Sequence, residues 1–526
     1  MLRRSADWIT AQQHSVRPSN GLDAWVLFAV VSAKLALHLP VLVRYDWNRD
    51  ELYFLECGRH LAAGYVDHAP LVPWIARLCE ATFGAELAAI RLPSLLAGAA
   101  AVALAVVLAR DLGGGRWAQL VAGLAALAPP AYLRMGSILC IPAFELLFWT
   151  AATWIILRIT IHGRLRLWLG AGVVVGLGLL VKHTMLLWCV GTIGALALVG
   201  PRAALRTRYF AGAVVVAGLL LAPNIVWQIR HDWPTVEFLS YIRQDQLEGI
   251  PRWQFLLGQI LYQHPFTLPL WLGGLWFLWR GSRTRFVACA YGIVLTAWLL
   301  TRAKPYYLAP AYLPLFAAGA VQLERAIRTG GRSRLRIAVP VALAAGTAAL
   351  VPFALPVLPL ETADRWIDRL VGFAIESPVD LTLELHDEYG WREQAQTLAH
   401  VRDTLAPEER ASCRILAWNY GQAAAVNVFG PAYGLPRAVS GNMSYFLWGP
   451  GEKTEVVLAF GMPRRELEPL FAEIAERERI GHPLAVPSEK DLPVYVCRRP
   501  RQSLLAAWPS LRRYWFGATL PTSPLR

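Results

Sequence analysis

The connection that begins at Asp50 and Glu51 carries side chains with which an enzyme can move a proton. Both carboxylates come directly after a long apolar run, and Asp67 and His68 follow in the same connection. A positioned carboxylate can accept the proton of an attacking hydroxyl or amine. Adjacent helical residues point about 100° apart, so we expect one of Asp50 and Glu51 to be functional and the other structural. An ordinary solvated pair is the alternative, but aromatic residues such as Tyr53 surround the two acids.

A second acid, Glu145, stands at the start of another apolar run. An ionisable side chain near the start of a membrane span is costly and marks a functional candidate, although reaching toward the interface would also accommodate it. Three cations, Lys182, Arg302 and Lys304, lie between apolar runs where cations are rare. Arg and Lys stabilise phosphoryl oxygens strongly where water is limited, so these cations predict a phosphate at the membrane surface. Pairing with the acids named above is the alternative.

Neither the histidines nor the cysteines have the spacing of a metal site. The seven cysteines include no CxxC pair, and His183, His231 and His264 are too widely separated to define a ligand set. We therefore expect no cofactor, and a divalent metal is an alternative that the sequence leaves open but does not indicate. Cys413 and Cys497 both lie in the C-terminal part of the chain. We expect them to be unpaired small apolar residues, and a disulfide between them is the alternative.

The elements that position these residues are predicted membrane helices. The chain has 526 residues, of which 56% are hydrophobic and 17% charged, and it contains 22 tryptophans. This composition is typical of a polytopic membrane protein and not of a soluble globule. Residues 24–43 can span a bilayer and lack a following cleavage site, so they predict a retained first helix. With later runs of similar length, about eleven spans are expected. The later runs are 93–109, 117–133, 143–161, 167–181, 184–200, 209–229, 255–279, 286–301, 306–323 and 337–358.

The net charge of +14 indicates topology and not nucleic-acid binding, because the arginines concentrate in every second loop. Those loops face the cytoplasm under the positive-inside rule. This predicts a multi-pass protein of the cell membrane (the inner or plasma membrane) with a cytoplasmic N-terminus, while loop 44–92 and the residues after about 359 face outward. The loop arginines are Arg110, Arg116, Arg158, Arg164, Arg166, Arg202, Arg206, Arg208, Arg280, Arg283, Arg285, Arg325, Arg328, Arg332, Arg334 and Arg336.

The composition changes near residue 360, where charged and apolar residues begin to mix. We expect a membrane domain over residues 1–359 and a soluble α/β domain over residues 360–526, which is large enough for its own core. Helix-like and strand-like stretches in the second domain are separated by Gly and Pro. The helix-like stretches are 391–405 and 463–479, and the strand-like stretches are 414–418, 454–460 and 494–498.

Several short motifs follow one another along residues 25–325. They are Asp50-Glu51-Leu52-Tyr53, Arg59-His60-Leu61, Gly64-Tyr65, Asp67-His68, Pro70-Leu71, Arg91-Leu92-Pro93, Leu147-Phe148-Trp149, Gly176-Leu177-Gly178-Leu179-Leu180 with Lys182, Pro223-Asn224 with Trp227, and Lys304-Pro305-Tyr306-Tyr307-Leu308-Ala309-Pro310-Ala311-Tyr312. In order and spacing, this series resembles the polyprenyl-phosphate-sugar-dependent glycosyltransferases of the family 39 and 83 type. These include the protein O-mannosyltransferases and the aminoarabinose transferase that modifies lipid A.

This resemblance implies a GT-C fold, which is a bundle of membrane helices with a catalytic outer loop, here 44–92, and a soluble domain on the same side. Members of these families move a sugar from a polyprenyl-phosphate donor to an acceptor outside the cytoplasmic membrane. By position, Asp50 matches the catalytic acid, Lys182 the donor-side lysine, and Glu145 an acid after the third span. The sequence departs from the family pattern at two places. The usual Asp-His-Pro-Pro reads Asp67-His68-Ala69-Pro70, and Glu145 stands where relatives have Asp.

The chemistry of sugar transfer agrees with this assignment. Transfer from a phosphate ester leaves a phosphate, so cations must stabilise the leaving group while a carboxylate takes the acceptor's proton. A single displacement inverts the anomeric centre. We expect Asp50 to be the base and Glu145 to orient the acceptor or support Asp50. The expected phosphate-binding residues are Lys182, Arg302 and Lys304, and those expected in the donor and acceptor pocket are Glu51, Tyr53, Asp67, His68, Tyr306 and Tyr307.

A transporter or lipid flippase is the alternative function, because it would also have many spans and charges within the membrane. It would place opposed charges at mid-bilayer in paired repeats with broken helices, and the sequence shows neither. A scaffolding membrane protein would not need outward cations together with outward acids. The predicted partners are a polyprenyl-phosphate-linked sugar, membrane lipids, and a lipid, glycan or protein acceptor. The sequence leaves the sugar and the acceptor open.

Overall fold

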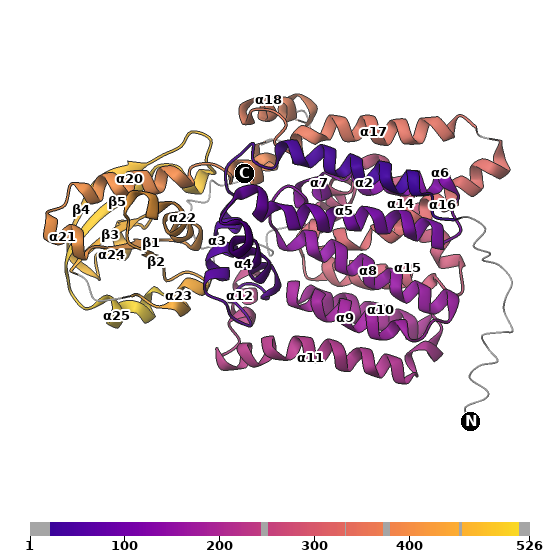
Figure 1. The fold of residues 1–526 in the computed structure, drawn as a ribbon, viewed down its shortest axis with the longest axis horizontal. Coiled ribbons are helices and arrows are strands. Elements are labelled where there is room, and N and C mark those ends of the chain that lie inside the picture. The colour runs from indigo at the N-terminus through magenta and orange to yellow at the C-terminus, as the bar shows by residue number, and fades with distance from the viewer. Residues whose placement is uncertain (1–20, 244–250, 332, 372–378, 452–454, 515–526) are drawn as a thin grey trace. The chain divides into compact units, whose positions relative to one another are not determined.

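The computed structural model describes residues 21–243, 251–331, 333–371, 379–451 and 455–514 (Figure 1). By their packing, the described residues form two units. The helical unit falls within Met1–Leu42, Arg91–Val226 and Leu247–Val357, and the mixed unit within Val43–Ile90, Trp227–Gln246 and Leu358–Arg526. Packing thus groups most of the expected outer loop with the C-terminal residues. The division of the sequence into domains 1–359 and 360–526 stays a prediction.

Long apolar helices make up the helical unit. Five helical segments of the described chain are long and apolar enough to cross a membrane, which identifies a multi-pass membrane protein. They are Ala24–Val41, Leu87–Asp111 (α5), Ile141–His162 (α8), Arg208–Arg230 (α11) and Leu335–Ala354 (α17), the first containing α2 (Ala24–His38) and η1 (Leu39–Val41). Shorter apolar helices are α9 (Leu167–Val181), α10 (Thr184–Leu198) and α15 (Arg285–Leu300), and η2 (Arg202–Leu205) is a short connection.

Three of the later apolar runs are not single helices, because each is broken at prolines. Proline lacks a backbone donor and clashes with the preceding helical turn, so it is disfavoured inside a helix and tolerated in the first turn of a new one. The run 117–133 contains α6 (Arg116–Leu127) and α7 (Pro130–Met135), and the run 255–279 contains α13 (Arg252–Tyr262), η4 (Pro265–Thr267) and α14 (Leu268–Arg280). The run 306–323 contains η5 (Pro305–Ala311) and the start of α16 (Leu313–Gly330).

The mixed unit combines helices with one five-stranded sheet of order β2-β1-β3-β5-β4. Strand β1 runs parallel to β2 and β3, whereas β5 runs antiparallel to β3 and β4. The strands are β1 (Arg414–Ala417), β2 (Ala438–Val439), β3 (Val456–Phe460), β4 (Phe471–Ile480) and β5 (Leu492–Pro500). The helices are α3 (Arg49–Arg59), α4 (Leu71–Phe83), α12 (Pro234–Ile242), α18 (Leu360–Val371), α19 (Val379–His386), α20 (Trp391–Asp403), α21 (Pro407–Ser412), α22 (Tyr420–Phe429), η6 (Gly430–Tyr433), α23 (Ser444–Trp448), α24 (Arg464–Leu467), η7 (Pro487–Glu489), α25 (Leu504–Ala507) and η8 (Trp508–Leu511).

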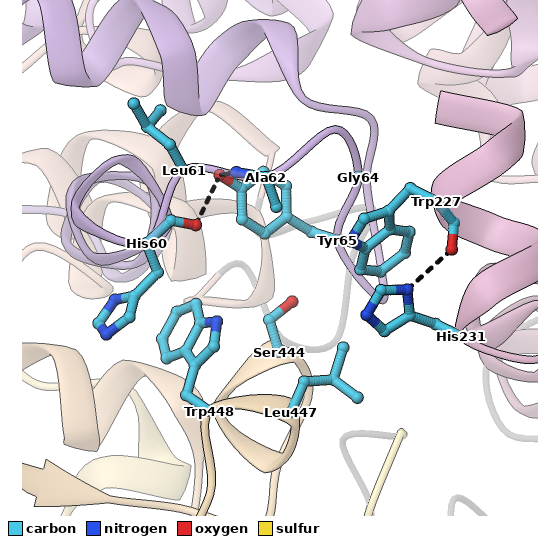
Figure 2. A pocket seen from close by; sticks show the side chains of 10 residues that line it. All are labelled: His60, Leu61, Ala62, Gly64, Tyr65, Trp227, His231, Ser444, Leu447 and Trp448. Atoms are coloured by element: carbon cyan, nitrogen blue, oxygen red, sulfur yellow. Dashed lines mark hydrogen bonds between the residues drawn. The ribbon is translucent and has the colours of Figure 1, made fainter. Parts of the chain in front are cut away.

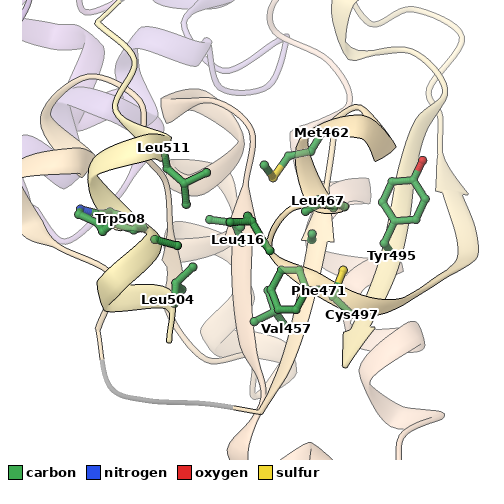
Figure 3. Packing of buried hydrophobic residues seen from close by; sticks show 13 residues of the cluster. Leu416, Val457, Met462, Leu467, Phe471, Tyr495, Cys497, Leu504, Trp508 and Leu511 are labelled. Atoms are coloured by element: carbon green, nitrogen blue, oxygen red, sulfur yellow. The ribbon is translucent and has the colours of Figure 1, made fainter. Parts of the chain in front are cut away.

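A hydrophobic core joins this sheet to the short helices that follow it (Figure 3). Leu416 and Val457 from the sheet pack in one buried cluster with Trp508 and Leu511 from η8. Burial of such side chains stabilises the fold by about 1.5–3 kcal/mol each. The mostly helical membrane protein with a small C-terminal sheet agrees with the expected fold class.

One expected helix, residues 463–479, is wrong. Only α24 is helical there, and Phe471–Ile480 forms β4, which pairs with β5. The residues Ala, Glu and Arg favour a helix locally, but pairing with β5 overrides that preference. Strand β4 lies at the edge of the sheet, where charged side chains such as Glu473 and Arg477 discourage pairing with another chain.

All seven cysteines are free thiols, including Cys413 and Cys497. Cys413 directly precedes β1, and Cys497 is in β5. Strand β3 lies between β1 and β5, since Val457 of β3 pairs with Arg414 on one side and with Cys497 on the other. Two strand spacings amount to about 10 Å, which is beyond the Cα separation that a disulfide can bridge. The disulfide alternative is therefore excluded for this fold.

Candidate active site

The first turn of α3 gives the two adjacent acids different roles. Asn48 caps the helix: its side-chain oxygen accepts the Asp50 N–H at 3.0 Å, and its own N–H donates to Glu51 at 2.9 Å. Glu51 is fully buried in this capping box, whereas Asp50 is exposed. A capping box satisfies helix donors that would otherwise have no partner. The structure therefore gives Glu51 a capping role in place of the pocket position expected for it.

Two tyrosines connect Asp50 with Asp67 inside the mixed unit. The Tyr420 hydroxyl donates to Oδ1 of Asp50 at 2.9 Å, and the Tyr53 hydroxyl donates to Oδ1 of Asp67 at 2.9 Å. The two tyrosine rings pack at 4.5 Å between centroids. The Ser444 N–H donates to the Tyr53 hydroxyl at 3.1 Å, which fixes that ring in place. Asp50, Tyr53 and Asp67 are thus brought together as expected, and Tyr420 is an addition.

Nothing in the motifs of the N-terminal part points to Tyr420, which lies 370 residues beyond Asp50. It is the first residue of α22, which begins shortly after β1 ends at Ala417. The Asn419 side chain caps this helix by accepting the Gln422 N–H at 2.9 Å. A strand followed by Asn and then by a helix is a recognisable signal. Functional side chains often lie at the carboxyl end of a strand in a parallel arrangement. That signal would have marked Tyr420 as a candidate.

The surroundings of Asp50 raise the pKa of its carboxyl above the ordinary value. Desolvation by the surrounding protein is the main cause, and the negative charges of Glu384 and Asp67 act in the same direction. The hydrogen bond from Tyr420 and the positive charge of Arg49 oppose this rise. A base whose pKa lies closer to neutrality than that of an ordinary aspartate is better matched to proton transfer.

Arg49 holds a further acid close to this site. Its guanidinium lies 2.7 Å from Asp387, which also accepts a weak hydrogen bond from the Asn48 amide at 3.4 Å. Desolvation raises the pKa of Asp387 to about 8, although the charge of Arg49 acts against that rise. The pKa values of Asp50 and Asp387 are therefore both raised above the ordinary value of an aspartate.

His68 is part of the packing around this site. The ring lies edge-on to Tyr53 and Phe54, with centroids 5.6 and 5.2 Å away, and its side chain is almost fully buried. Its Nδ1 lies 3.1 Å from the Ala69 carbonyl oxygen, and its Nε2 lies 3.9 Å from Asp67. These contacts orient the turn that carries Asp67.

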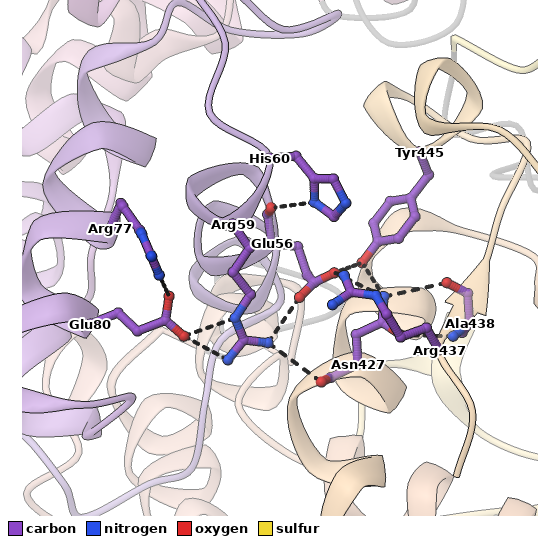
Figure 4. A network of polar contacts seen from close by, with 9 residues as sticks. All are labelled: Glu56, Arg59, His60, Arg77, Glu80, Asn427, Arg437, Ala438 and Tyr445. Carbon is purple, nitrogen blue, oxygen red and sulfur yellow. Dashed lines mark hydrogen bonds and ion pairs between the residues drawn. The ribbon is translucent and has the colours of Figure 1, made fainter. Parts of the chain in front are cut away.

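A buried polar network anchors α3 inside the mixed unit (Figure 4). Glu56 is fully buried, and its carboxylate accepts hydrogen bonds from Arg59 at 2.9 Å, Arg437 at 2.6 Å and Asn427 at 2.8 Å. The Tyr445 hydroxyl also donates to it at 3.2 Å. A buried carboxylate is stable only when it is paired and hydrogen-bonded, as Glu56 is. Through Glu56, residues from α22 to α23 fix the helix that carries Asp50.

A cavity of about 310 Å³ lies beside the same loop (Figure 2). Two imidazole–indole stacks lie in its wall: His60 on Trp448 and His231 on Trp227. Ser444 also lines the cavity, and its N–H donates to Tyr53. The sequence motifs contain His60 and Trp227, but no pattern in the sequence brings them together.

The helical unit contains the other expected site residues. Lys182 follows α9, and its Nζ lies 3.1 Å from Glu145 of α8 and 4.0 Å from the centre of the Tyr307 ring. Tyr306 is somewhat farther, at 5.8 Å, and the Thr184 hydroxyl donates to the Glu145 carboxylate. Lys182 therefore lies next to Glu145 and to the Tyr306–Tyr307 pair, all of which were candidate site residues in the sequence. In this state Lys182 is paired with Glu145, which is the pairing considered as an alternative to phosphate binding.

Arg302 and Lys304 are not among the partners of Lys182 in the described structure. Arg302 is exposed and has a left-handed backbone with φ of 54°, and Lys304 precedes η5. His183 contacts Asn224 at 3.0 Å through Nε2. Within the described residues, no group of three or more His, Cys, Asp and Glu side chains could hold a metal ion.

Comparisons with known proteins agree with the motifs. Residues 67–227 match the sequence profile of the family described as dolichyl-phosphate-mannose-protein mannosyltransferase. The fold is similar to crystal structures of ArnT from Cupriavidus metallidurans, one bound to undecaprenyl phosphate and one in the apo state. For both structures the TM-score is 0.58 and the sequence identity is 16%, and the match covers 90% of this chain. The match covers 98% of the ArnT chain in the bound structure and 97% in the apo structure. No curated protein sequence matches the chain. The chain therefore has the GT-C fold and resembles the polyprenyl-phosphate-sugar glycosyltransferases, as its motifs predict.

Proposed function

We propose that this protein is an inverting glycosyltransferase that moves a sugar from a polyprenyl-phosphate donor to an acceptor outside the cytoplasmic membrane. The observation that carries the proposal is the different environment of the two adjacent acids at the start of α3. Glu51 is buried as a cap, while Asp50 remains exposed and accepts a hydrogen bond from Tyr420. An exposed, oriented carboxylate with a raised pKa is suited to act as a general base. The likeness to an ArnT solved with undecaprenyl phosphate supports a lipid-phosphate donor.

In the proposed reaction, the acceptor attacks the anomeric carbon of the donor sugar in one displacement. Tyr420 holds one oxygen of Asp50, so the other oxygen takes the proton of the attacking hydroxyl or amine. The bond between the sugar and the phosphate breaks, and the polyprenyl phosphate leaves with the electron pair. Because Asp50 activates the acceptor and forms no covalent intermediate, the anomeric centre is inverted.

The departing phosphate needs positive charge. We assign this role to Lys182, which stands against the Tyr307 ring, with Arg302 and Lys304 as further candidates. Charge-assisted contacts to phosphate oxygens are among the strongest hydrogen bonds in proteins. Glu145, in contact with Lys182, positions that cation and supports the acceptor side. The mechanism as proposed invokes no metal and is compatible with a lipid, glycan or protein acceptor.

Donor turnover by the purified protein tests the function. Full-length protein in lipid nanodiscs is incubated with a panel of polyprenyl-phosphate sugars and with envelope lipids and glycans as acceptors. We expect release of polyprenyl phosphate together with a new glycosidic product, both followed by mass spectrometry. A transporter or flippase would move the lipid without breaking its sugar–phosphate bond. Intact donors throughout the panel, together with lipid movement in vesicles, would contradict the proposal.

The proposed orientation places residues 44–92 and the C-terminal residues outside the cytoplasmic membrane, because the arginine-rich loops face inward. Residues 1–20, which contain the N-terminus assigned to the cytoplasm, lie outside the described residues. Ala85 and Gln502 are exposed, and Ala203 is exposed in an arginine-rich connection. In a cysteine-free background, Ala85→Cys and Gln502→Cys should react with an impermeant thiol reagent in intact spheroplasts. Ala203→Cys should react only after lysis, and the reverse pattern would overturn the orientation.

A further inference from the structure

Aromatic rings form much of the wall of the cavity in the mixed unit (Figure 2). The His60 ring lies 4.1 Å from the Trp448 ring at an interplanar angle of 11°, and the His231 ring lies 4.2 Å from Trp227 at 21°. Flat aromatic surfaces held in place bury the apolar face of a ring-shaped ligand at little cost in side-chain entropy. The His60–Trp448 stack joins segments far apart in the sequence, whereas Trp227 and His231 are one helical turn apart. Only the folded unit brings the two stacks to one cavity.

Both histidines are held with an acceptor nitrogen available. The Nδ1 atom of His60 lies 3.0 Å from the Glu56 carbonyl oxygen, and that of His231 lies 2.8 Å from the Trp227 carbonyl oxygen. A carbonyl oxygen can only accept, so Nδ1 carries the hydrogen in each ring. In the neutral rings, Nε2 is then a hydrogen-bond acceptor. Two such acceptors suit a ligand that carries several hydroxyl donors.

The cavity has no charged group suited to an ionic ligand. None of the ten described residues that line it is Lys, Arg, Asp or Glu. Phosphate binding would need cations, and an amine would need a carboxylate or an equivalent set of acceptors. Its volume of about 310 Å³ is at the lower end of the usual range for small-molecule sites. The lining therefore favours a compact, neutral, hydroxyl-rich ring.

The cavity is connected directly to the residues around Asp50. Ser444 lines it and donates its N–H to the Tyr53 hydroxyl at 3.1 Å. Tyr53 in turn donates to Asp67 at 2.9 Å, and its ring packs on Tyr420, the partner of Asp50. The cavity wall is therefore linked to Asp67 through Tyr53, and to Asp50 through Tyr53 and Tyr420.

We propose that this cavity binds a neutral sugar ring of the acceptor, so that the acceptor is a glycan or a glycan-bearing molecule. Sugar C–H groups pack on the indoles of Trp448 and Trp227, and sugar hydroxyls donate to Nε2 of His60 and His231. The binding of a neutral sugar follows from the cavity itself. Its role as an acceptor subsite rests on the proposed glycosyltransferase function.

Direct sugar binding tests this inference without a donor. The probes are the methyl glycosides of glucose, mannose and galactose, and the measurement is saturation-transfer NMR on full-length protein in nanodiscs. At least one probe should bind, and Trp448→Ala should weaken it by roughly three- to tenfold, as loss of an aromatic contact predicts. Trp448→Phe keeps an aromatic surface and should retain most of the binding. Trp253→Ala removes a tryptophan that is 61% exposed and lies outside the cavity lining, and should bind as the unmodified protein does.

The outcomes separate this inference from the proposed function. Unfolding temperatures of all variants show whether any loss reflects a change in stability. Binding that Trp448→Ala weakens at unchanged stability supports the sugar site, even if no donor is consumed. Absence of binding by every probe would overturn the inference, and so would equal binding in Trp448→Ala, even if sugar transfer is intact. If the protein both binds a sugar and transfers one, the KM for a glycan acceptor should be raised in Trp448→Ala. An unchanged KM would overturn the role of the cavity as an acceptor subsite.

Discussion

Asp50→Asn is expected to lower the turnover of sugar transfer by about 10²–10⁴-fold while donor binding stays largely intact. Asparagine preserves the size of the side chain and can still accept the hydrogen bond that Tyr420 donates at 2.9 Å. It cannot take up the proton of the acceptor. Turnover and donor affinity, measured separately on purified protein in nanodiscs, distinguish the loss of a base from the loss of a binding contact.

Glu51→Gln is the matched control, because it removes the neighbouring charge but keeps a side-chain oxygen. In the unmodified protein this oxygen accepts the Asn48 N–H at 2.9 Å. Glutamine serves at this position of a capping box as glutamate does, so the variant should keep an unfolding temperature close to that of the unmodified protein and lose less turnover than Asp50→Asn. Near-normal turnover in Asp50→Asn would contradict the assignment of the base. A larger loss in Glu51→Gln at unchanged stability would contradict it as well.

The pH dependence of turnover should report the same group. A base works only when it is deprotonated, so turnover should fall as the pH falls through the pKa of Asp50. Desolvation raises that pKa, which moves the acid limb above the range of an ordinary aspartate, about 3.9. Asp387 is a competing origin, because its pKa is raised to about 8. The acid limb should persist in Asp387→Asn, and its disappearance there would assign it to Asp387.

The sequence alone was enough to predict those features of the fold and the site that local patterns determine. Apolar runs of bilayer length became helices, and their breaks coincide with prolines such as Pro130, Pro265 and Pro305. The different roles of Asp50 and Glu51 were also within reach. Asn48 followed three residues later by Glu51 is a capping-box signature, which marks Glu51 as the structural member of the pair.

The sequence was insufficient where contacts join distant segments. Tyr420 reaches Asp50 across 370 residues, and Arg437 reaches Glu56 across 381. Periodicity and propensity describe neighbours in the chain and carry no information about such pairs. The strand β4 (Phe471–Ile480) was missed for the same reason, because its pairing with β5 outweighs the helical preference of its residues.

Lys182→Ala is expected to weaken use of the donor by roughly ten- to a hundredfold, since a hydrogen bond to a charged group contributes about 1.5–3 kcal/mol. The cation is already positioned, with Nζ 4.0 Å from the centre of the Tyr307 ring. A donor phosphate bound there would share Lys182 with Glu145, which lies 3.1 Å away. The KM for the donor, compared with kcat at saturating donor, measures the effect.

A purely structural pair between Lys182 and Glu145 would also make Lys182→Ala defective, because Glu145 is buried and would lose its cation. Removing one partner of a buried ion pair costs about 3–5 kcal/mol of stability. The double variant Lys182→Ala/Glu145→Gln removes both charges and should recover much of the unfolding temperature. If Lys182 binds the donor phosphate, the KM for the donor stays raised in the double variant. If the double variant uses the donor as well as the unmodified protein does, the pair is structural, and the phosphate role moves to Arg302 or Lys304.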